Sequence, residues 1–180
     1  MKHMLKMISF SFILVALVAC GGSNADKGNV EITFPASFYE GVSLDEEELQ
    51  AEADEEGMGE VKVNDDGSIT YSMPKEMHDD LLETTAAELK TSFEEIVEDE
   101  DFPSIQDITY NDDFTEFTLI VDQELFENSF DGFAVMSVGF SGMIYQVYEG
   151  KGDDVEVVVN YQNVETGDVF ETVKFPEDME

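Results

Sequence analysis

Runs of neighbouring carboxylates are the most frequent chemical feature of the chain, in which Asp and Glu account for 43 of 180 residues. Calcium takes about six to eight oxygen ligands, and carboxylates are among its usual donors in proteins. The candidate ligands are Asp99 and Asp101 in one run, and Asp112 and Asp113 in another. No run has the Asp-x-Asp-x-Asp-Gly spacing of a calcium-binding loop. A solvated, self-repelling acidic surface is therefore the competing interpretation of these residues.

Catalysis by carboxylates is a second chemical interpretation of the same composition. Paired carboxylates can act as acid and as base or nucleophile in glycoside hydrolysis. So many acidic residues form pairs at every spacing by chance, and the chain has no Trp to stack on a sugar. The histidines are His3 and His78, and no Gly-x-Ser-x-Gly elbow or Gly-rich phosphate loop accompanies them. We therefore expect no catalytic residue and no cofactor, with His78 a solvated helix residue.

The charge balance excludes one class of partner. The chain has eight Lys and no Arg, which gives a formal net charge of −35. So negative a surface repels a polyanion, and the guanidinium groups that read guanine and clamp phosphates are absent. We therefore expect no nucleic-acid binding, whereas cationic partners and divalent cations are compatible with this charge. A hydrophobic fraction of 42% with 14 Phe still predicts a folded core.

The N-terminal segment has the pattern of an export signal. Lys2 and Lys6 precede an apolar run from Met7 to Val18, which is too short to span a bilayer. The run ends in Leu17-Val18-Ala19-Cys20, and this motif resembles the lipobox of bacterial lipoproteins. The resemblance implies that residues 1–19 are a signal peptide, that Cys20 is diacylated, and that cleavage occurs in front of it. The acyl chains would then anchor the protein in the outer face of the cell membrane.

Processing at Cys20 would change both the thiol content and the charge of the chain. Cys20 is the only cysteine, so no thiol would be left for a disulfide or a Cys-ligated zinc. Removal of residues 1–19 takes away two Lys and no acidic residue, which changes the side-chain charge from −35 to −37. Residues 20–29 are small and polar and predict a flexible tether. The opening Cys20-Gly21-Gly22-Ser23 and the acidic body look like acidic surface lipoproteins of Gram-positive, Firmicutes-type bacteria, many of which have no assigned activity.

The rest of the chain alternates strand and helix patterns. Alternating apolar residues predict a strand over 30–34, and a Ser-x-x-Glu capping box at Ser43 predicts a short, solvated helix that ends near Gly57. Asp66-Gly67 predicts a tight hairpin between strands at 61–63 and 69–73. An amphipathic helix is expected from Pro74 to about Glu98.

The C-terminal half predicts two more strand pairs around an apolar helix. The first pair covers 105–110 and 114–121, and the second covers 155–161 and 169–175. Between them, a long helix is expected from Gln123 to about Tyr148, with Asp122 as its N-cap. Because no charged residue lies between Asp131 and Gln146, we expect this helix to be completely buried across the sheet.

These elements predict one acidic α+β domain over residues 30–180. The order β-α-ββ-α-ββ-α-ββ favours a largely antiparallel sheet of hairpins alternating with helices, with the helices packed mainly on one face. We expect a lipid-anchored, extracytoplasmic protein that is not an enzyme and that binds or scaffolds a surface protein or a cationic peptide. Two alternatives stay open: a carboxylate-dependent hydrolase acting on the cell wall or on peptides, and a calcium-linked surface protein.

Overall fold

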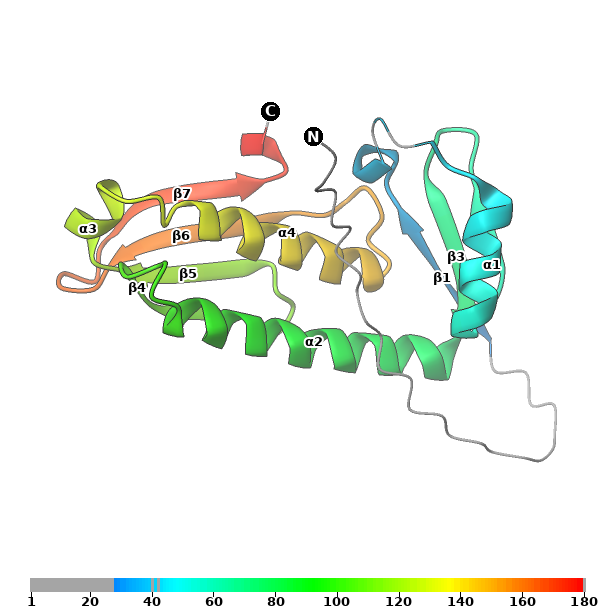
Figure 1. Ribbon diagram of the computed structural model, residues 1–180, viewed down its shortest axis with the longest axis horizontal. Coiled ribbons are helices and arrows are strands. Elements are labelled where there is room, and N and C mark those ends of the chain that lie inside the picture. The colour runs from blue at the N-terminus through cyan, green and yellow to red at the C-terminus, as the bar shows by residue number, and fades with distance from the viewer. Residues whose placement is uncertain (1–27, 40, 42, 180) are drawn as a thin grey trace, which may run out of the picture.

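Two β-sheets form the framework of the chain, where the sequence led us to expect one (Figure 1). The computed structural model describes residues 28–39, 41 and 43–179. Cys20, the predicted signal peptide and most of the predicted tether lie outside these residues. One sheet has three strands and the other has four, and all neighbouring strands are antiparallel except β5 and β6. The predicted α+β class with mostly antiparallel pairing is confirmed, and the prediction of a single sheet is wrong.

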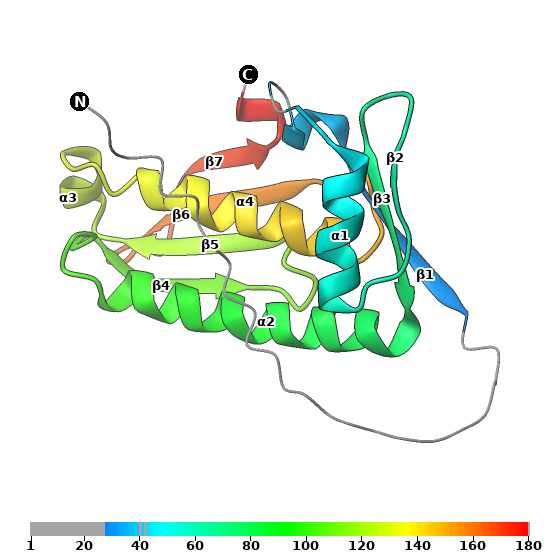
Figure 2. The same cartoon turned by 45° about the vertical axis from the view of Figure 1, so that its right-hand side comes forward.

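The first sheet holds the N-terminal strands in the order β1-β3-β2. Its strands are β1 (Asn29–Phe34), β2 (Val61–Val63) and β3 (Ile69–Pro74). β2 and β3 form the predicted hairpin, in which Gly67 has the positive φ of 87° that a tight turn requires. Helix α1 (Glu46–Glu56) lies against this sheet (Figure 2).

The start of α1 differs from the predicted capping box. Asp45, rather than Ser43, is the N-cap, and its carboxylate accepts hydrogen bonds from the backbone N–H groups of Glu47 and Glu48. The carboxylate of Glu46 instead accepts from the N–H of Val63, at 2.8 Å. This bond links α1 to the edge strand β2. It gives a partner to the N–H of Val63, which has no neighbouring strand on that side of the sheet. The sequence pattern identified the helix but not its tertiary partner.

Helix α2 (Lys75–Glu98) runs along both sheets and joins them (Figure 1). Its 24 residues correspond to a length of about 36 Å. Leu81, near its start, packs with Ile32 and Met73 of the first sheet. Phe93, near its end, is buried in the larger core over the second sheet. One amphipathic helix therefore contributes to two hydrophobic clusters.

The second sheet has the order β4-β5-β6-β7. Its strands are β4 (Ile105–Tyr110), β5 (Glu116–Val121), β6 (Val157–Asn163) and β7 (Val169–Phe175). β5 and β6 are parallel neighbours, and such a pair requires a crossover connection. Helices α3 (Gln123–Glu127) and α4 (Phe133–Tyr148) supply it. Alternate residues of β5 and β6 are buried, on the face covered by α2 and α4 (Figure 2).

The predicted continuous helix over 123–148 is interrupted between α3 and α4. At the break, Asp131 is buried and accepts hydrogen bonds from the backbone N–H of Ser104, at 2.8 Å, and from its hydroxyl. Burial alone would raise the pKa of Asp131, but hydrogen bonds from Ser104 and Ser129 hold it below its usual value of 3.8. A contact between residues far apart in the sequence therefore fixes the turn.

Helix α4 is buried on one side only, so the prediction of a completely buried helix is wrong. Phe133, Met136 and Phe140 are 69%, 45% and 42% exposed, and Phe130 just before the helix is 83% exposed. On the buried side, Gly139 and Gly142 pack directly against the ring of Phe175 and the backbone of Phe114, where an added Cβ would clash. None of the helices in the described residues is long and apolar enough to cross a membrane.

Candidate functional site

The four predicted calcium ligands lie at two separate turns. Asp99 and Asp101 follow the end of α2, where the Asp99 carboxylate accepts a hydrogen bond from the N–H of Asp101. Asp112 and Asp113 lie in the turn between β4 and β5, and all four residues are exposed. Within residues 28–39, 41 and 43–179, no three side chains of His, Cys, Asp or Glu are grouped so that they could hold a metal ion. Calcium binding at these residues stays a prediction.

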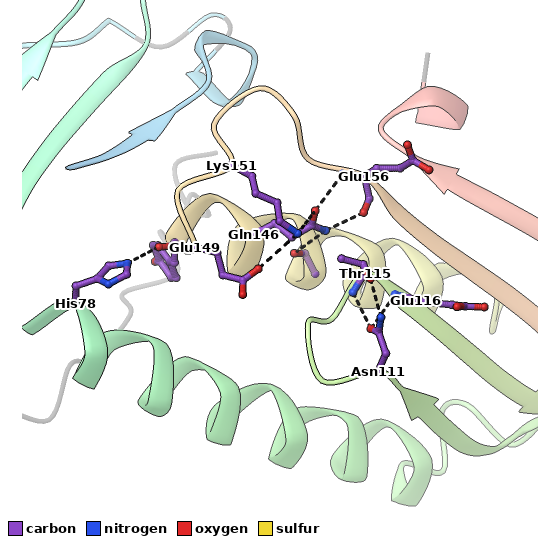
Figure 3. Close-up of polar contacts among 10 residues, drawn as sticks. His78, Asn111, Thr115, Glu116, Gln146, Glu149, Lys151 and Glu156 are labelled. Atoms are coloured by element: carbon purple, nitrogen blue, oxygen red, sulfur yellow. Dashed lines mark hydrogen bonds and ion pairs between the residues drawn. The ribbon is translucent and has the colours of Figure 1, made fainter. Parts of the chain in front are cut away.

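His78 is buried, in contrast to the expected solvated position. Its side chain lies 9% exposed on α2, and its Nε2 is 2.7 Å from the backbone carbonyl oxygen of Tyr148 (Figure 3). Because a carbonyl can only accept, Nε2 is the protonated ring nitrogen. His78 therefore connects the start of α2 to the end of α4 and fixes the position of Tyr148.

A second polar cluster, around Gln146, holds the connection between α4 and β6 (Figure 3). The buried Gln146 amide donates to the carbonyl of Glu156 at 2.8 Å and accepts from its N–H at 3.2 Å. Lys151 lies 3.4 Å from the Gln146 amide oxygen and 3.6 Å from the Glu149 carboxylate. These contacts satisfy one another, as expected for a structural network.

A cavity of about 220 Å³ lies between α1, the first sheet, the start of α2 and the end of α4. It combines apolar and aromatic walls with two carboxylates. Its lining consists of Ile32, Phe34, Leu49, Glu52, Ala53, Glu56, Met58, Tyr71, Leu81 and Tyr148. Pockets with mostly apolar walls and a few placed polar groups are the usual form of small-molecule sites. We call this feature the aromatic cavity.

Helix α1 supplies both carboxylates of the aromatic cavity, because the spacing of its residues places them on the side that lines the cavity. Leu49, Glu52, Ala53 and Glu56 follow one another at steps of three, one and three residues, which places them on one face of a helix. Ala53 is buried against the first sheet, so this is the inner face of α1. Glu52 and Glu56 are exposed at its border. Neither carboxylate forms a hydrogen bond or ion pair with another described residue.

Three aromatic rings from distant parts of the chain meet in the aromatic cavity. Ile32 and Tyr71 are register partners across β1 and β3, and Phe34 lies two positions further along on the same face. The Phe34 ring centroid is 5.7 Å from that of Tyr71 and 5.8 Å from that of Tyr148, with interplanar angles of 75° and 80°. The steep angles are those of edge-to-face pairs, so the rings form walls in different planes.

The tyrosine hydroxyls of this region are in a negative and partly dehydrated environment. Burial raises the pKa of Tyr39 to about 12, with further contributions from Tyr71 and Tyr148. Burial also raises the pKa of Tyr71, and the charges of Glu52 and Glu56 add to the effect. For Tyr148, burial acts together with Tyr71, Glu56 and Glu88 to raise the pKa. The phenols therefore stay neutral at physiological pH, and the charge at the cavity is that of the carboxylates.

A larger open hollow of about 490 Å³ lies beside the exposed side of α4. Phe38 and Phe140 form part of it, with their ring centroids 5.7 Å apart. The hollow also includes Pro176 and Met179 near the C-terminal end of the described chain. It extends the row of exposed apolar side chains on α4 into a shallow apolar surface.

No protein-family model, curated protein or solved structure matches this chain. Sequence reasoning missed the aromatic cavity because Phe34, Tyr71 and Tyr148 belong to three separate elements, each with an ordinary core pattern. The available signal was the inner face of α1, where two Glu share the helical spacing of Leu49 and Ala53.

Proposed function

We propose that the protein is a lipid-anchored, extracytoplasmic binding protein without catalytic activity, held at the outer face of the cell membrane by acyl chains on Cys20. The observation that carries this proposal is the sequence Leu17-Val18-Ala19-Cys20 at the end of a short apolar run. The residues from Cys20 up to the start of β1 at Asn29 would act as the tether, and the rest of the chain as the binding domain. The partner would be a surface protein or peptide, or another ligand of cationic character, as the net charge of −35 favours.

The binding role is supported by the contents of the aromatic cavity. Its walls combine rings, aliphatic side chains and two carboxylates that have no partner among the described residues. His78 would be the natural base for nucleophilic chemistry, but its Nε2 is engaged by the carbonyl of Tyr148. A small ligand can be held by such walls without any group being positioned to react with it.

We also propose a scaffold in which hairpins alternate with helices, in the order β-α-ββ-α-ββ-α-ββ, with the helices mainly on one face. In this arrangement the binding surfaces lie on the helical side of the domain.

Metabolic labelling with an alkyne fatty acid tests the anchor in cells that produce the full-length chain. We expect the wild type to incorporate the label and to partition with membranes, and Cys20→Ser to do neither. Ser23→Ala is the matched control, since it alters the tether but keeps the lipobox residues, and it should be labelled like the wild type. Absence of label from the wild type would overturn the proposal.

A further inference from the structure

We infer that the aromatic cavity binds a small organic cation with a quaternary ammonium group. This inference rests on the proposed binding function and names the class of ligand for it. The volume of about 220 Å³ lies below the range of about 300 to 1,000 Å³ that is typical of sites for drug-sized ligands. The cavity is therefore suited to one compact group and not to an extended molecule.

The aromatic walls provide the first reason for this ligand class. Phe34, Tyr71 and Tyr148 all line the cavity, and Phe34 meets both tyrosine rings at steep angles. The negative face of an aromatic ring attracts a cation, and rings in several planes can surround one from more than one side. A quaternary ammonium group also brings methyl groups, which bury apolar surface against Ile32 and Leu81.

The carboxylates provide the second reason. Glu52 and Glu56 are located at the border of the cavity, on the same helical face, and lack an ion pair within the described chain. Burial raises the pKa of the Tyr71 hydroxyl, and the charges of Glu52 and Glu56 add to this effect. A cation between the rings and the carboxylates would be favoured by both groups. The lining contains no Lys, so no residue of the cavity repels it.

The same geometry argues against the other ligand classes. An anion would meet two carboxylates and the acidic surface of the whole molecule. A divalent metal ion requires several oxygen ligands around it, whereas two Glu side chains and rings line this cavity. A neutral apolar molecule would fit the walls but would not be attracted by the carboxylates. The experiment must therefore compare two ligands of the same shape that differ in charge.

Calorimetric titration of the full-length protein in neutral detergent, with choline and with its neutral isostere 3,3-dimethylbutan-1-ol, isolates the charge. We expect saturable binding of choline and at least tenfold weaker binding of the isostere. Glu56→Gln should weaken choline binding at least fivefold. Glu55→Gln is the matched control, because it removes the same charge from the same helix at a residue that does not line the cavity, and it should change the affinity less than twofold.

Three results would overturn the inference: no choline binding, equal binding of the isostere, or equal weakening by both Glu variants. Tyr71→Leu should abolish binding and Tyr71→Phe should retain it, if the ring is the recognised feature. Repeating the titration on the full-length Cys20→Ser chain separates this result from the anchor, because binding in the cavity does not require acylation. Competition by phosphatidylcholine in mixed micelles with the same detergent would identify a lipid head group as the source of the cation, and absence of competition would identify a free small molecule.

Discussion

Asp131 is the residue that shows most clearly how one buried side chain sets local structure. It is 2% exposed, and its partner Ser104 is fully buried. Its carboxylate receives two hydrogen bonds from Ser104 at the point where α3 gives way to α4. A buried charge is tolerated when it is hydrogen-bonded in this way. The hydrogen bonds that hold the Asp131 carboxylate therefore account for the break in the helix predicted over 123–148.

Asp131→Ala should lower the free energy of unfolding by about 1.5 to 3 kcal/mol, the usual contribution of hydrogen bonds to a charged group. Urea denaturation measures this change. Asp101→Ala is the control, since Asp101 is exposed, and such substitutions usually change stability by less than about 0.5 kcal/mol. Equal stability of the two variants would show that the Asp131 contacts do not stabilise the fold.

The contribution of Asp131 should depend on pH in a defined direction. Its pKa in the folded state lies below the usual 3.8, so the folded state favours the charged form more than the unfolded state does. The stabilisation is then fully present above the unfolded pKa and is lost as the pH falls through the folded pKa. We expect the difference in unfolding free energy between the wild type and Asp131→Asn to be constant from pH 7 to about 5 and to shrink below pH 4. A difference that stays constant at acid pH would contradict this account.

Among the secondary-structure elements, the sequence predicted those that depend on neighbouring residues. It did not predict features that depend on contacts between distant parts of the chain. The hairpin of β2 and β3 follows from Asp66-Gly67, a turn that needs no distant partner. The break before α4 depends on a contact between Asp131 and Ser104, which lies 27 residues earlier in the chain. The exposure of Phe133 depends on which face of α4 is covered by the second sheet. The aromatic cavity joins β1, β3 and α4 in the same way. The strand and helix patterns could be found in the sequence, but the packing between them could not.

Two methionines of α4 offer a matched test of the half-buried helix. Met143 is 1% exposed and Met136 is 45% exposed. Met143→Ala should lower the free energy of unfolding by about 2 to 5 kcal/mol, as expected for a core truncation. Met136→Ala should change it by less than about 0.5 kcal/mol, although both variants alter the same helix by the same side chain. Similar losses in urea denaturation would mean that the outer face of α4 is covered.

At the scale of the whole molecule, the excess of carboxylates is the dominant property. The described residues include five Lys and many more Asp and Glu. Few ion pairs form among them. Like charges at this density repel one another and lower the stability of the compact state, and salt screens the repulsion. The charge is therefore expected to affect solubility and stability throughout the domain.

Added salt should raise the thermal midpoint of the full-length protein, since it screens this repulsion. Calcium, magnesium and potassium chloride at equal ionic strength should give similar increases, and EDTA should have no effect of its own. A saturable increase specific to calcium would indicate a site, because a ligand that binds only the folded state stabilises it by mass action. Asp99→Asn and Asp112→Asn would then identify which of the two turns forms it.

We propose that the protein acts at the outer face of the membrane through a lipidated Cys20. Intact-mass spectrometry of the protein extracted from membranes tests this anchoring, because one measurement reports both the cleavage site and the modification. We predict a chain that begins at Cys20 and carries a diacylglyceryl group on its sulfur. A mass that corresponds to the unprocessed chain, or to an unmodified chain cleaved at another residue, would contradict the account.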